Sequence, residues 1–333
     1  MGWIKPPHIS RSVILRKFII RRIIQILPTL LFVLLTVFIL MKLIPGDTAA
    51  VLLGPEARAE DITAYRAELG LDQPVVTQFL LYVKRVLTGD FGKSLIYKQD
   101  VVSLIFERFP TTLILSLSAL CIAFIIGVPL GVLSAIKHNS FSDLLITIIS
   151  LLGISIPIFW FGMMLILLFS LQLGWLPAVG LGSMSNGLWD VISHLILPSF
   201  ALAILSLGTI TRFTRSSMLE VLRQDYIRTA NAKGLKKGKV FYRHALRNAL
   251  VPIITVIGLQ LGNLLAGAVL TETVFALPGL GKLMVDGIFR RDFLLVQGEV
   301  LFIALVYIIV NLLVDILYAV VNPKIRTSYR GAQ

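Results

Sequence analysis

Residues 225–252 read DYIRTANAKGLKKGKVFYRHALRNALVP and form a long basic interruption in a chain whose residues are 56% hydrophobic. Only 15% of the 333 residues are charged, whereas roughly a quarter are charged in a typical soluble domain. The mean hydropathy of +0.88 agrees with this shortage of charge. The composition therefore predicts an integral membrane protein, in which the basic stretch is a water-exposed connection between apolar segments.

Apolar segments long enough to cross a bilayer recur along the chain. A helix that rises about 1.5 Å per residue needs roughly 20 apolar residues to cross a hydrocarbon core of about 30 Å. Pro129 and Pro157 lie within such segments and mark positions that are prone to kink. We therefore predict an all-α integral membrane protein with six transmembrane helices, at residues 23–44, 111–136, 143–171, 192–211, 251–271 and 300–321.

Charge is divided unevenly between the two sets of connections. The connections that include both termini and residues 225–252 carry a net charge of +17, and the alternate connections carry −4. Because cytoplasmic connections are enriched in Lys and Arg, this places the basic N-terminus 1–22, the connection 212–250 and the tail 322–333 in the cytoplasm, with residues 45–110 outside. The sequence pI of about 10.0 thus reflects orientation and does not indicate nucleic-acid binding.

The external region 45–110 begins with a turn signal, IPGD. Val75, Phe79, Tyr82 and Val86 recur at helical spacing after the turn at Asp72–Pro74, which predicts a short amphipathic helix. This external region either caps the outer mouth and meets an external partner or is simply a packed loop.

The basic stretch around residues 225–252 predicts one helix on each side of a glycine. Residues 220–233 favour a helix, and Gly234 supplies the backbone freedom for a sharp turn after it. Beyond the turn, one helical stripe is basic, at Lys236, Lys239, Arg243 and Arg247. The opposite face is apolar, at Val240, Phe241, Ala245 and Ala249.

Two functions fit this cytoplasmic segment, which consists of the predicted helices on either side of Gly234. The cations could hold anionic lipid head groups. Alternatively, the small residues Thr229, Ala230 and Ala232 suit close docking against another protein. The length of the stretch, compared with the very short connection 137–143, favours docking.

The stretches DYIRTANAKG and RHALRNALVP resemble the coupling motif of ATP-binding-cassette (ABC) importer permeases, in its dipeptide, oligopeptide and nickel branch. Arg228 stands where the general motif has Glu, whereas Gly234 is retained. His244, Leu246 and Arg247 replace the later Ile, Leu and Pro. The resemblance extends over most of the chain, and is closest to the first permease subunit of dipeptide importers, through IPGD, LGLDQP, GDFG, TRSSMLEVL, LTETVFALPGLG and VNPKIR.

The resemblance implies a type I importer permease fold with residues 111–321 as its core. It also implies a site that docks a cytoplasmic ATPase, formed by Asp225, Tyr226, Arg228, Thr229, Ala230, Ala232, Lys233 and Gly234. The chain contains no Gly-x4-Gly-Lys-Ser/Thr pattern, so ATP and Mg²⁺ are expected on partner subunits and no cofactor or enzymatic activity is expected here. The partners it implies are a second permease, two ATPase subunits and an external binding protein in a bacterial inner membrane.

Polar residues within the spans are candidates for the substrate pathway. Gln260 and Asn263 share a helical face in the fifth predicted span, as do Asn311 and Asp315 in the sixth. Such residues line a polar route or join helices to one another. The four histidines match no ligand spacing, so no metal site is predicted.

Other classes of function fit less well. An ion-coupled secondary transporter would place titratable groups near the middle of the membrane, and the predicted spans have none there. A membrane enzyme would need a nucleophile and base, or a metal site, held close together. A passive channel would not need a long basic connection such as residues 212–250. If the chain is an importer permease, peptides are the expected substrates, and glutathione, nickel chelates, opines and oligosaccharides are alternatives.

Overall fold

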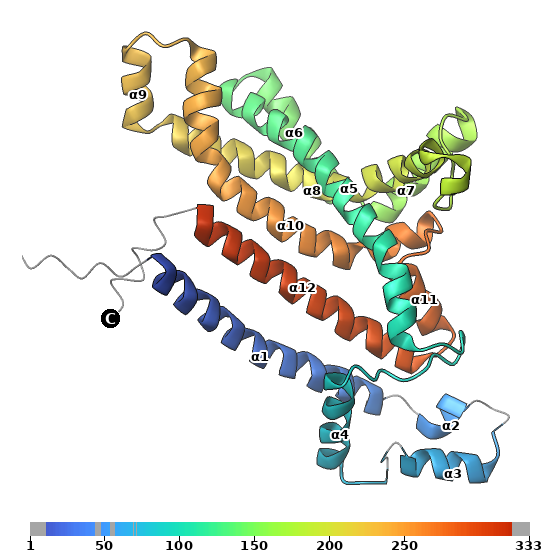
Figure 1. Cartoon of the computed structure of the whole chain (residues 1–333). Coiled ribbons are helices and arrows are strands. Elements are labelled where there is room, and N and C mark those ends of the chain that lie inside the picture. Colours follow the sequence, from blue (N-terminus) through green and yellow to red (C-terminus); the bar gives the residue numbers. More distant parts are fainter. Residues whose placement is uncertain (1–10, 44–47, 54–56, 69, 71, 322–333) are drawn as a thin grey trace, which may run out of the picture.

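The computed structural model describes residues 11–43, 48–53, 57–68, 70 and 72–321, most of which are helical (Figure 1). Apart from one isolated bridge between Lys93 and Asp100, these residues show no β-structure. The helices are α1 Arg11–Leu43, α2 Thr48–Leu53, α3 Ala59–Glu68, α4 Val75–Leu87, α5 Val101–Ile136, α6 Phe141–Ser155, α7 Ile158–Leu165, η1 Ile166–Gln172, η2 Met184–Asn186, α8 Leu188–Leu222, α9 Asp225–Ala232, η3 Lys239–Leu246, α10 Arg247–Val274, α11 Leu280–Phe289 and α12 Phe293–Val321.

The described helices confirm a helical membrane protein. Four stretches are long and apolar enough to cross a bilayer, namely Val101–Ile136, Leu188–Leu222, Pro252–Val274 and Phe293–Leu317, and a bent pair adds up to one more. In α1 the described apolar stretch, Ile24–Leu40, is shorter. The count of six spans therefore stays a prediction. Several helices run well beyond the predicted spans, because hydropathy marks only the apolar part of a helix.

The predicted span 143–171 is not one straight helix. It is divided into α6 and the α7–η1 segment, which meet at an angle of 104°. The break falls at Ile156, which is extended (φ −75°, ψ 129°), and Pro157, which precedes α7. Proline lacks the backbone N–H and disfavours a helical conformation in the residue before it, so the kink expected at Pro157 is confirmed as a sharp bend.

Helix α8 lies at the centre of the bundle, with α5, α6 and α10 packed against it. Helices α5 and α8 approach closely at Gly131, where a Cβ atom would lie 2.6 Å from the Thr214 Cβ and 2.6 Å from the Thr211 carbonyl oxygen. The main hydrophobic core follows this contact and includes Leu202 and Ile210 of α8. Small residues let membrane helices approach closely, so α5 and α8 form the rigid centre of the fold.

The external region contains the predicted amphipathic helix, as α4. Gly89 (φ +76°) lies in the turn that follows it. Residues 44–47, which include the IPGD turn, lie outside the described residues. Phe79 and Tyr82 of α4 pack on Phe38 of α1, with ring centroids 5.3 and 5.9 Å apart. This part of the region 45–110 is therefore packed onto the C-terminal end of α1.

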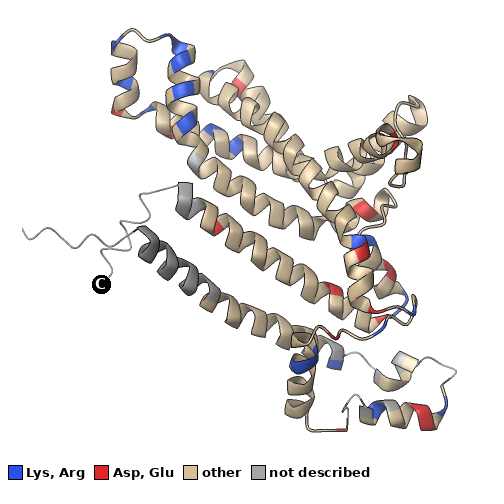
Figure 2. Cartoon of the chain, viewed as in Figure 1, with Lys and Arg blue, Asp and Glu red and all other residues tan. Residues whose placement is uncertain are grey.

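The two ends of the bundle carry different charges. In Figure 2, Lys and Arg gather at the end formed by α9 and η3, whereas most Asp and Glu lie toward the opposite end. The described ends of α1 and α12, at Arg11 and Val321, lie at the α9 end (Figure 1). The arrangement is the one that the uneven charge of the connections predicts. Residues 1–10 and the tail 322–333 lie outside the described part of the chain.

Candidate functional site

The first feature of the predicted docking site is the short helix α9, between two breaks in the chain. Helix α8 ends at Leu222, and the extended Gln224 (ψ 148°) starts α9, so the predicted single helix over 220–233 is wrong at its first residues. After α9, Gly234 adopts φ +72° and donates its N–H to the Asn231 carbonyl over 2.9 Å. The glycine turn was predicted, whereas the break before Asp225 was not, because no Gly or Pro marks it.

The second half of the stretch is not a separate helix. The π-helical segment η3 continues directly into α10, so the basic stripe forms the first turns of the helix that crosses the membrane next. Val240 and Ala245 are fully buried, as predicted for the apolar face. The stripe residues Lys236, Lys239, Arg243 and Arg247 are exposed.

Helix α9 is held in place from one side. Ile227 and Ala230 are 2% and 8% exposed and join the main hydrophobic core together with Val240. Asn248 of α10 donates a hydrogen bond of 2.8 Å from Nδ2 to the Tyr226 hydroxyl. Helix α9 is therefore joined to the start of α10 by packing and by a hydrogen bond.

The opposite side of α9 is open. Arg228 and Asp225 are 78% and 95% exposed in their side chains, and their contact of 3.5 Å is an ordinary surface pair. Among the other predicted docking residues, Thr229, Ala232, Lys233 and Gly234 are exposed and Tyr226 is 43% exposed. Ala230 instead faces the interior of this chain, so its small size serves internal packing.

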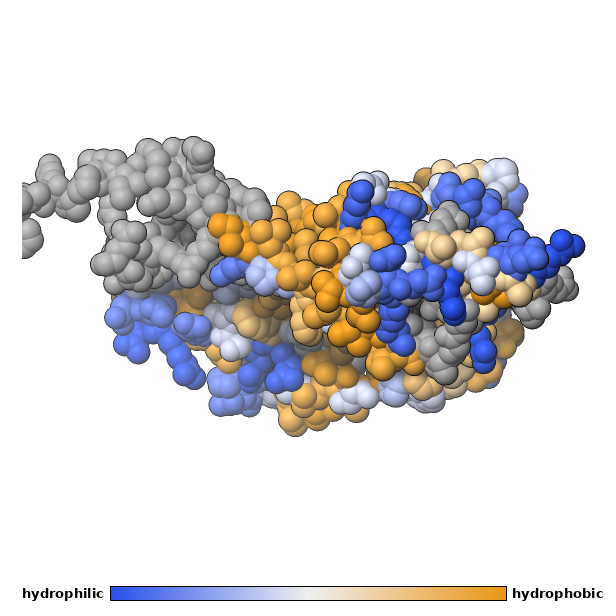
Figure 3. All heavy atoms as spheres, turned by 90° about the horizontal axis from the view of Figure 1, so that it is seen from below, coloured by the Kyte–Doolittle hydropathy of each residue, from blue (hydrophilic) through white to orange (hydrophobic). Residues whose placement is uncertain are grey.

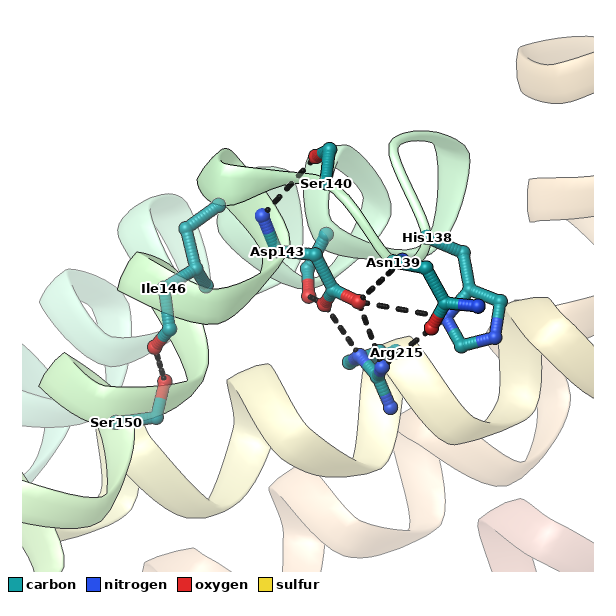
Figure 4. Close-up of polar contacts among 8 residues, drawn as sticks. His138, Asn139, Ser140, Asp143, Ile146, Ser150 and Arg215 are labelled. Carbon is teal, nitrogen blue, oxygen red and sulfur yellow. Dashed lines mark hydrogen bonds and ion pairs between the residues drawn. The ribbon is translucent and has the colours of Figure 1, made fainter.

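An ion pair beside this site was not singled out from the sequence. Arg215 of α8 donates from Nε to Asp143 Oδ1 over 2.7 Å and from Nη2 to Oδ2 over 2.8 Å (Figure 4). The Ser134 hydroxyl and the Asn139 backbone N–H also donate to Asp143, over 2.5 and 2.9 Å. His138 Nδ1 lies 3.3 Å from Asp143 Oδ2. The carboxylate is thus surrounded by donors from α5, the α5–α6 turn and α8.

This Asp143 cluster ties three helices together on the side of the membrane that bears α9. Asp143 is 4% exposed, and bidentate Arg–carboxylate pairs are among the stronger charge-assisted contacts. Ser140, which caps α6 by accepting from the Asp143 N–H, forms with Asp143 an S-x-x-D capping pattern. That pattern predicts a helix start from the sequence. The pairing of Asp143 with Arg215, 72 residues away, is seen only in the three-dimensional structure.

The predicted pathway residues divide into different environments. Gln260 is buried and accepts from the Ser206 hydroxyl over 3.4 Å, so it joins α10 to α8. Asn263 is exposed on this chain, with its Nδ2 3.5 Å from Gln260 Oε1. Asn311 and Asp315 are half-buried on α12. Gln260 thus contacts a second helix of this chain, whereas Asn263 lies on the outer surface of the chain.

A set of buried acids near the C-terminal end of α10 and the start of α12 was also missed. The predicted spans stopped at residue 271 and began at 300, so Glu272 and Glu299 were counted as water-exposed; both are fully buried within helices. Glu272 accepts from the Thr112 hydroxyl over 2.6 Å and from the Lys282 N–H over 3.1 Å. Neither carboxyl oxygen of Glu299 has a hydrogen-bond partner. Glu272 thus joins α10 to α5 and α11.

Within the described part of the chain, no group of three or more His, Cys, Asp or Glu side chains could hold a metal ion.

Comparison with known proteins places this geometry in a family. Residues 127–327 match the model of the binding-protein-dependent transport system inner membrane component, and residues 15–117 match its N-terminal companion. The chain belongs to this family. Its members are permease subunits of ABC importers rather than enzymes, which confirms the resemblance seen in the sequence and the expected class of function. The passive-channel alternative loses its support.

Curated relatives match along nearly the whole permease. The chain is 45% identical over 334 residues to a di/tripeptide transport system permease, DppB, of Pseudomonas aeruginosa, with 93% of this chain and 98% of the relative covered. It is 44% identical over 309 residues to a glutathione transport system permease, GsiC, of Salmonella paratyphi A, with the same shares covered. A dipeptide permease DppB of Alkalihalophilus pseudofirmus is 41% identical over 329 residues, covering 93% of this permease and 99% of the relative.

A solved structure shares the fold. An inward-facing form of the MetNI methionine ABC transporter matches with a TM-score of 0.54 and 18% identity, covering 66% of this permease and 97% of that chain. At 18% sequence identity, this similarity shows a shared fold and nothing about function. It confirms the architecture of an ABC importer permease.

Proposed function

We propose that this permease carries di- and oligopeptides across the bacterial inner membrane, in an importer driven by separate ATPase subunits. The observation that supports the substrate class most directly is 45% identity to a di/tripeptide permease over 93% of the chain. The partners in this proposal are two ATPase subunits that hold ATP and Mg²⁺, an external binding protein and a second permease. Both termini are cytoplasmic in this arrangement.

The ATPase docks on the open side of α9. Asp225, Arg228, Thr229 and Ala232 are exposed there, while Ile227 anchors the helix to the core from the other side. A helix that is fixed on one face and free on the other can act as a lever. When the ATPases close, the movement of α9 reaches α10 through its packing and through the Tyr226–Asn248 hydrogen bond.

The Asp143 cluster gives the same movement a second route. Arg215 lies on α8, the helix that leads into α9, and its pair with Asp143 connects α8 to α6 and the α5–α6 turn. The cytoplasmic ends of these helices then move as one block. Rigid elements joined in this way favour a concerted rocking of the bundle over local distortion.

Asn263, exposed on α10, is the pathway candidate that the structure leaves most accessible. Its amide offers hydrogen-bonding groups at membrane depth, where polar side chains commonly face a water-filled route or a second subunit. In this proposal Asn263 faces the route between the two permeases, together with the half-buried Asn311 and Asp315 of α12.

The docking part of the proposal is tested with Ala232→Trp. Because Ala232 is exposed, the permease should fold normally. A large side chain on this face would hold the ATPase away from α9, so the ATPase should bind at least roughly tenfold more weakly in a pull-down of the complex. Ala232→Ser is the matched control that keeps the side chain small. Unchanged ATPase binding by Ala232→Trp would count against docking at α9.

The substrate class is tested by uptake. Proteoliposomes that contain the whole complex, with the binding protein encoded beside it, should accumulate a labelled dipeptide in an ATP-dependent way. Glutathione is the second candidate, because a glutathione permease is 44% identical. Uptake of glutathione with no competition from dipeptides would favour it instead.

A further inference from the structure

The external helix α4 has one face that is fully occupied by this chain. Gln78 is buried, and Phe79 and Tyr82 form an aromatic cluster with Phe38 of α1. Gln78 also donates from Nε2 to the Gln73 carbonyl over 2.7 Å. These contacts fix the rotation of α4 about its own axis, and therefore determine which side chains point away from the protein.

The face that points away is also apolar. Val76, Leu80 and Leu87 are 71%, 61% and 79% exposed and lie on one helical stripe, at spacings of four and seven residues. Lys84 lies on the same stripe, is exposed, and sits between Leu80 and Leu87. An external helix facing only water would be expected to carry polar residues on this stripe. The outer face of α4 therefore needs an apolar environment.

The position of α4 relative to the spans identifies that environment. Figure 1 shows α4 beside the external end of α1 and crossing its direction, while α2 and α3 lie farther out from the bundle. Leu40 and Leu43, at this end of α1, are 57% and 72% exposed. Figure 3, the view from below, shows hydrophobic side chains gathered over the middle of the molecule. The apolar surface of the membrane-spanning helix thus continues onto α4.

We propose that α4 lies in the outer leaflet of the membrane, with Val76, Leu80 and Leu87 among the upper acyl chains and Lys84 reaching up to lipid phosphate. A lysine within an apolar stripe suits this place, because its alkyl stem covers apolar surface while its ammonium group stays at the head groups. Arg85, half-buried on the next position, adds positive charge at the same level.

This placement has a mechanical consequence. Helix α4 is packed on α1 on one side and held by lipid on the other. The external region that contains α2 and α3 is therefore mounted on the leaflet surface and keeps a fixed height above the membrane. This inference rests on the membrane location of the chain and on its proposed orientation, and not on its substrate.

The test uses the whole importer in lipid nanodiscs of phosphatidylethanolamine and phosphatidylglycerol. The four native tryptophans, Trp3, Trp160, Trp175 and Trp189, are replaced by Phe, and one Trp is introduced at Leu80. Leu80→Trp fluorescence should be blue-shifted and quenched by lipids brominated near the top of the acyl chain. Leu40→Trp on α1 is the membrane control, and Thr63→Trp on the exposed side of α3 is the water control.

The outcomes separate the possible occupants of this face. Quenching of Leu80→Trp to a similar extent as Leu40→Trp, with Thr63→Trp unquenched, supports the proposal. No quenching by brominated lipid, with a spectral shift only after the external binding protein is added, would overturn it in favour of a protein partner. No response to either would also overturn it. Lys84→Glu should reduce the quenching of Leu80→Trp, and more strongly as the phosphatidylglycerol fraction rises.

Discussion

Arg215 and Asp143 form a two-pronged ion pair between α8 and α6, in which both carboxylate oxygens accept from the guanidinium at 2.7 and 2.8 Å. Two further donors, Ser134 and Asn139, also contact the carboxylate, and His138 Nδ1 lies 3.3 Å from its Oδ2. The pair lies close to the α8 end that leads into α9, so it holds together the end of the bundle that bears α9.

Asp143→Asn should destabilise the permease. The amide keeps the shape of the carboxylate but loses its charge and one acceptor, and hydrogen bonds to charged groups contribute about 1.5–3 kcal/mol each. We expect a clear fall in the thermal unfolding temperature of the purified chain in detergent. Lys282→Met, which removes a partly exposed pair with Asp286 at 3.3 Å, should cost less than about 1 kcal/mol. Equal effects of the two variants would contradict a special role for the Asp143 cluster.

Exchanging the two charged partners should not restore stability. In the double variant Asp143→Arg with Arg215→Asp, a guanidinium would face the Ser134 hydroxyl and the Asn139 N–H, which now donate to a carboxylate. The backbone donor would lose its acceptor. Recovery of the wild-type unfolding temperature by the double variant would show that only the sign of the charges matters.

Gly131→Ala should weaken the packing of α5 on α8. The added Cβ would lie 2.6 Å from the Thr211 carbonyl oxygen and from the Thr214 Cβ, so the helices must separate. Overpacking of this kind typically costs about 1–3 kcal/mol. Gly267→Ala in α10 is the control, because no atom lies within 4 Å of its added Cβ. That control should be neutral or gain up to about 1 kcal/mol of helix propensity. Denaturation of both variants in the same micelles compares them directly.

Much of the membrane fold follows from patterns that one sequence displays. Long apolar runs predict the spans, the surplus of Lys and Arg predicts the charged end, and Gly234 predicts the turn after α9. Each of these signals is local, or is a sum over connections. The same holds for α4, since Phe79 and Tyr82 recur at helical spacing and do form its packed face.

The features that were missed depend on contacts between distant residues. The sequence places Glu272 in a water-exposed connection, because hydropathy falls at its position. In the structure, hydrogen bonds from the Thr112 hydroxyl and the Lys282 N–H stabilise Glu272 inside the fold. Pro157 signals a kink, but the 104° bend depends on how α7 packs against α8 and α10. Ala230 suits a docking surface by size, and only the fold shows that it faces inward.

The buried acids Glu272 and Glu299 should respond in opposite ways to the same substitution. Glu272→Gln loses charge-assisted bonds from the Thr112 hydroxyl and the Lys282 N–H, at a cost of about 1.5–3 kcal/mol. Glu299 has no partner for either oxygen, so Glu299→Gln breaks no hydrogen bond and removes a carboxyl whose charged form is costly to bury, and it should be neutral or stabilising. Thermal unfolding of both single variants measures the contrast. A loss of stability in Glu299→Gln as large as in Glu272→Gln would reveal a donor to Glu299.

Gly234→Ala should loosen the turn after α9 without disturbing its packing. No atom lies within 4 Å of the added Cβ, but Gly234 has φ +72°, where a residue with a side chain is strained by about 1 kcal/mol or more. Gly238→Ala is the matched control, since Gly238 also has free space around it and adopts φ −59°. Trypsin should cleave at the exposed Lys233 and Lys236 faster in Gly234→Ala than in Gly238→Ala. Equal cleavage rates would mean that the turn keeps its geometry without glycine, and that the strain expected from φ is absorbed elsewhere.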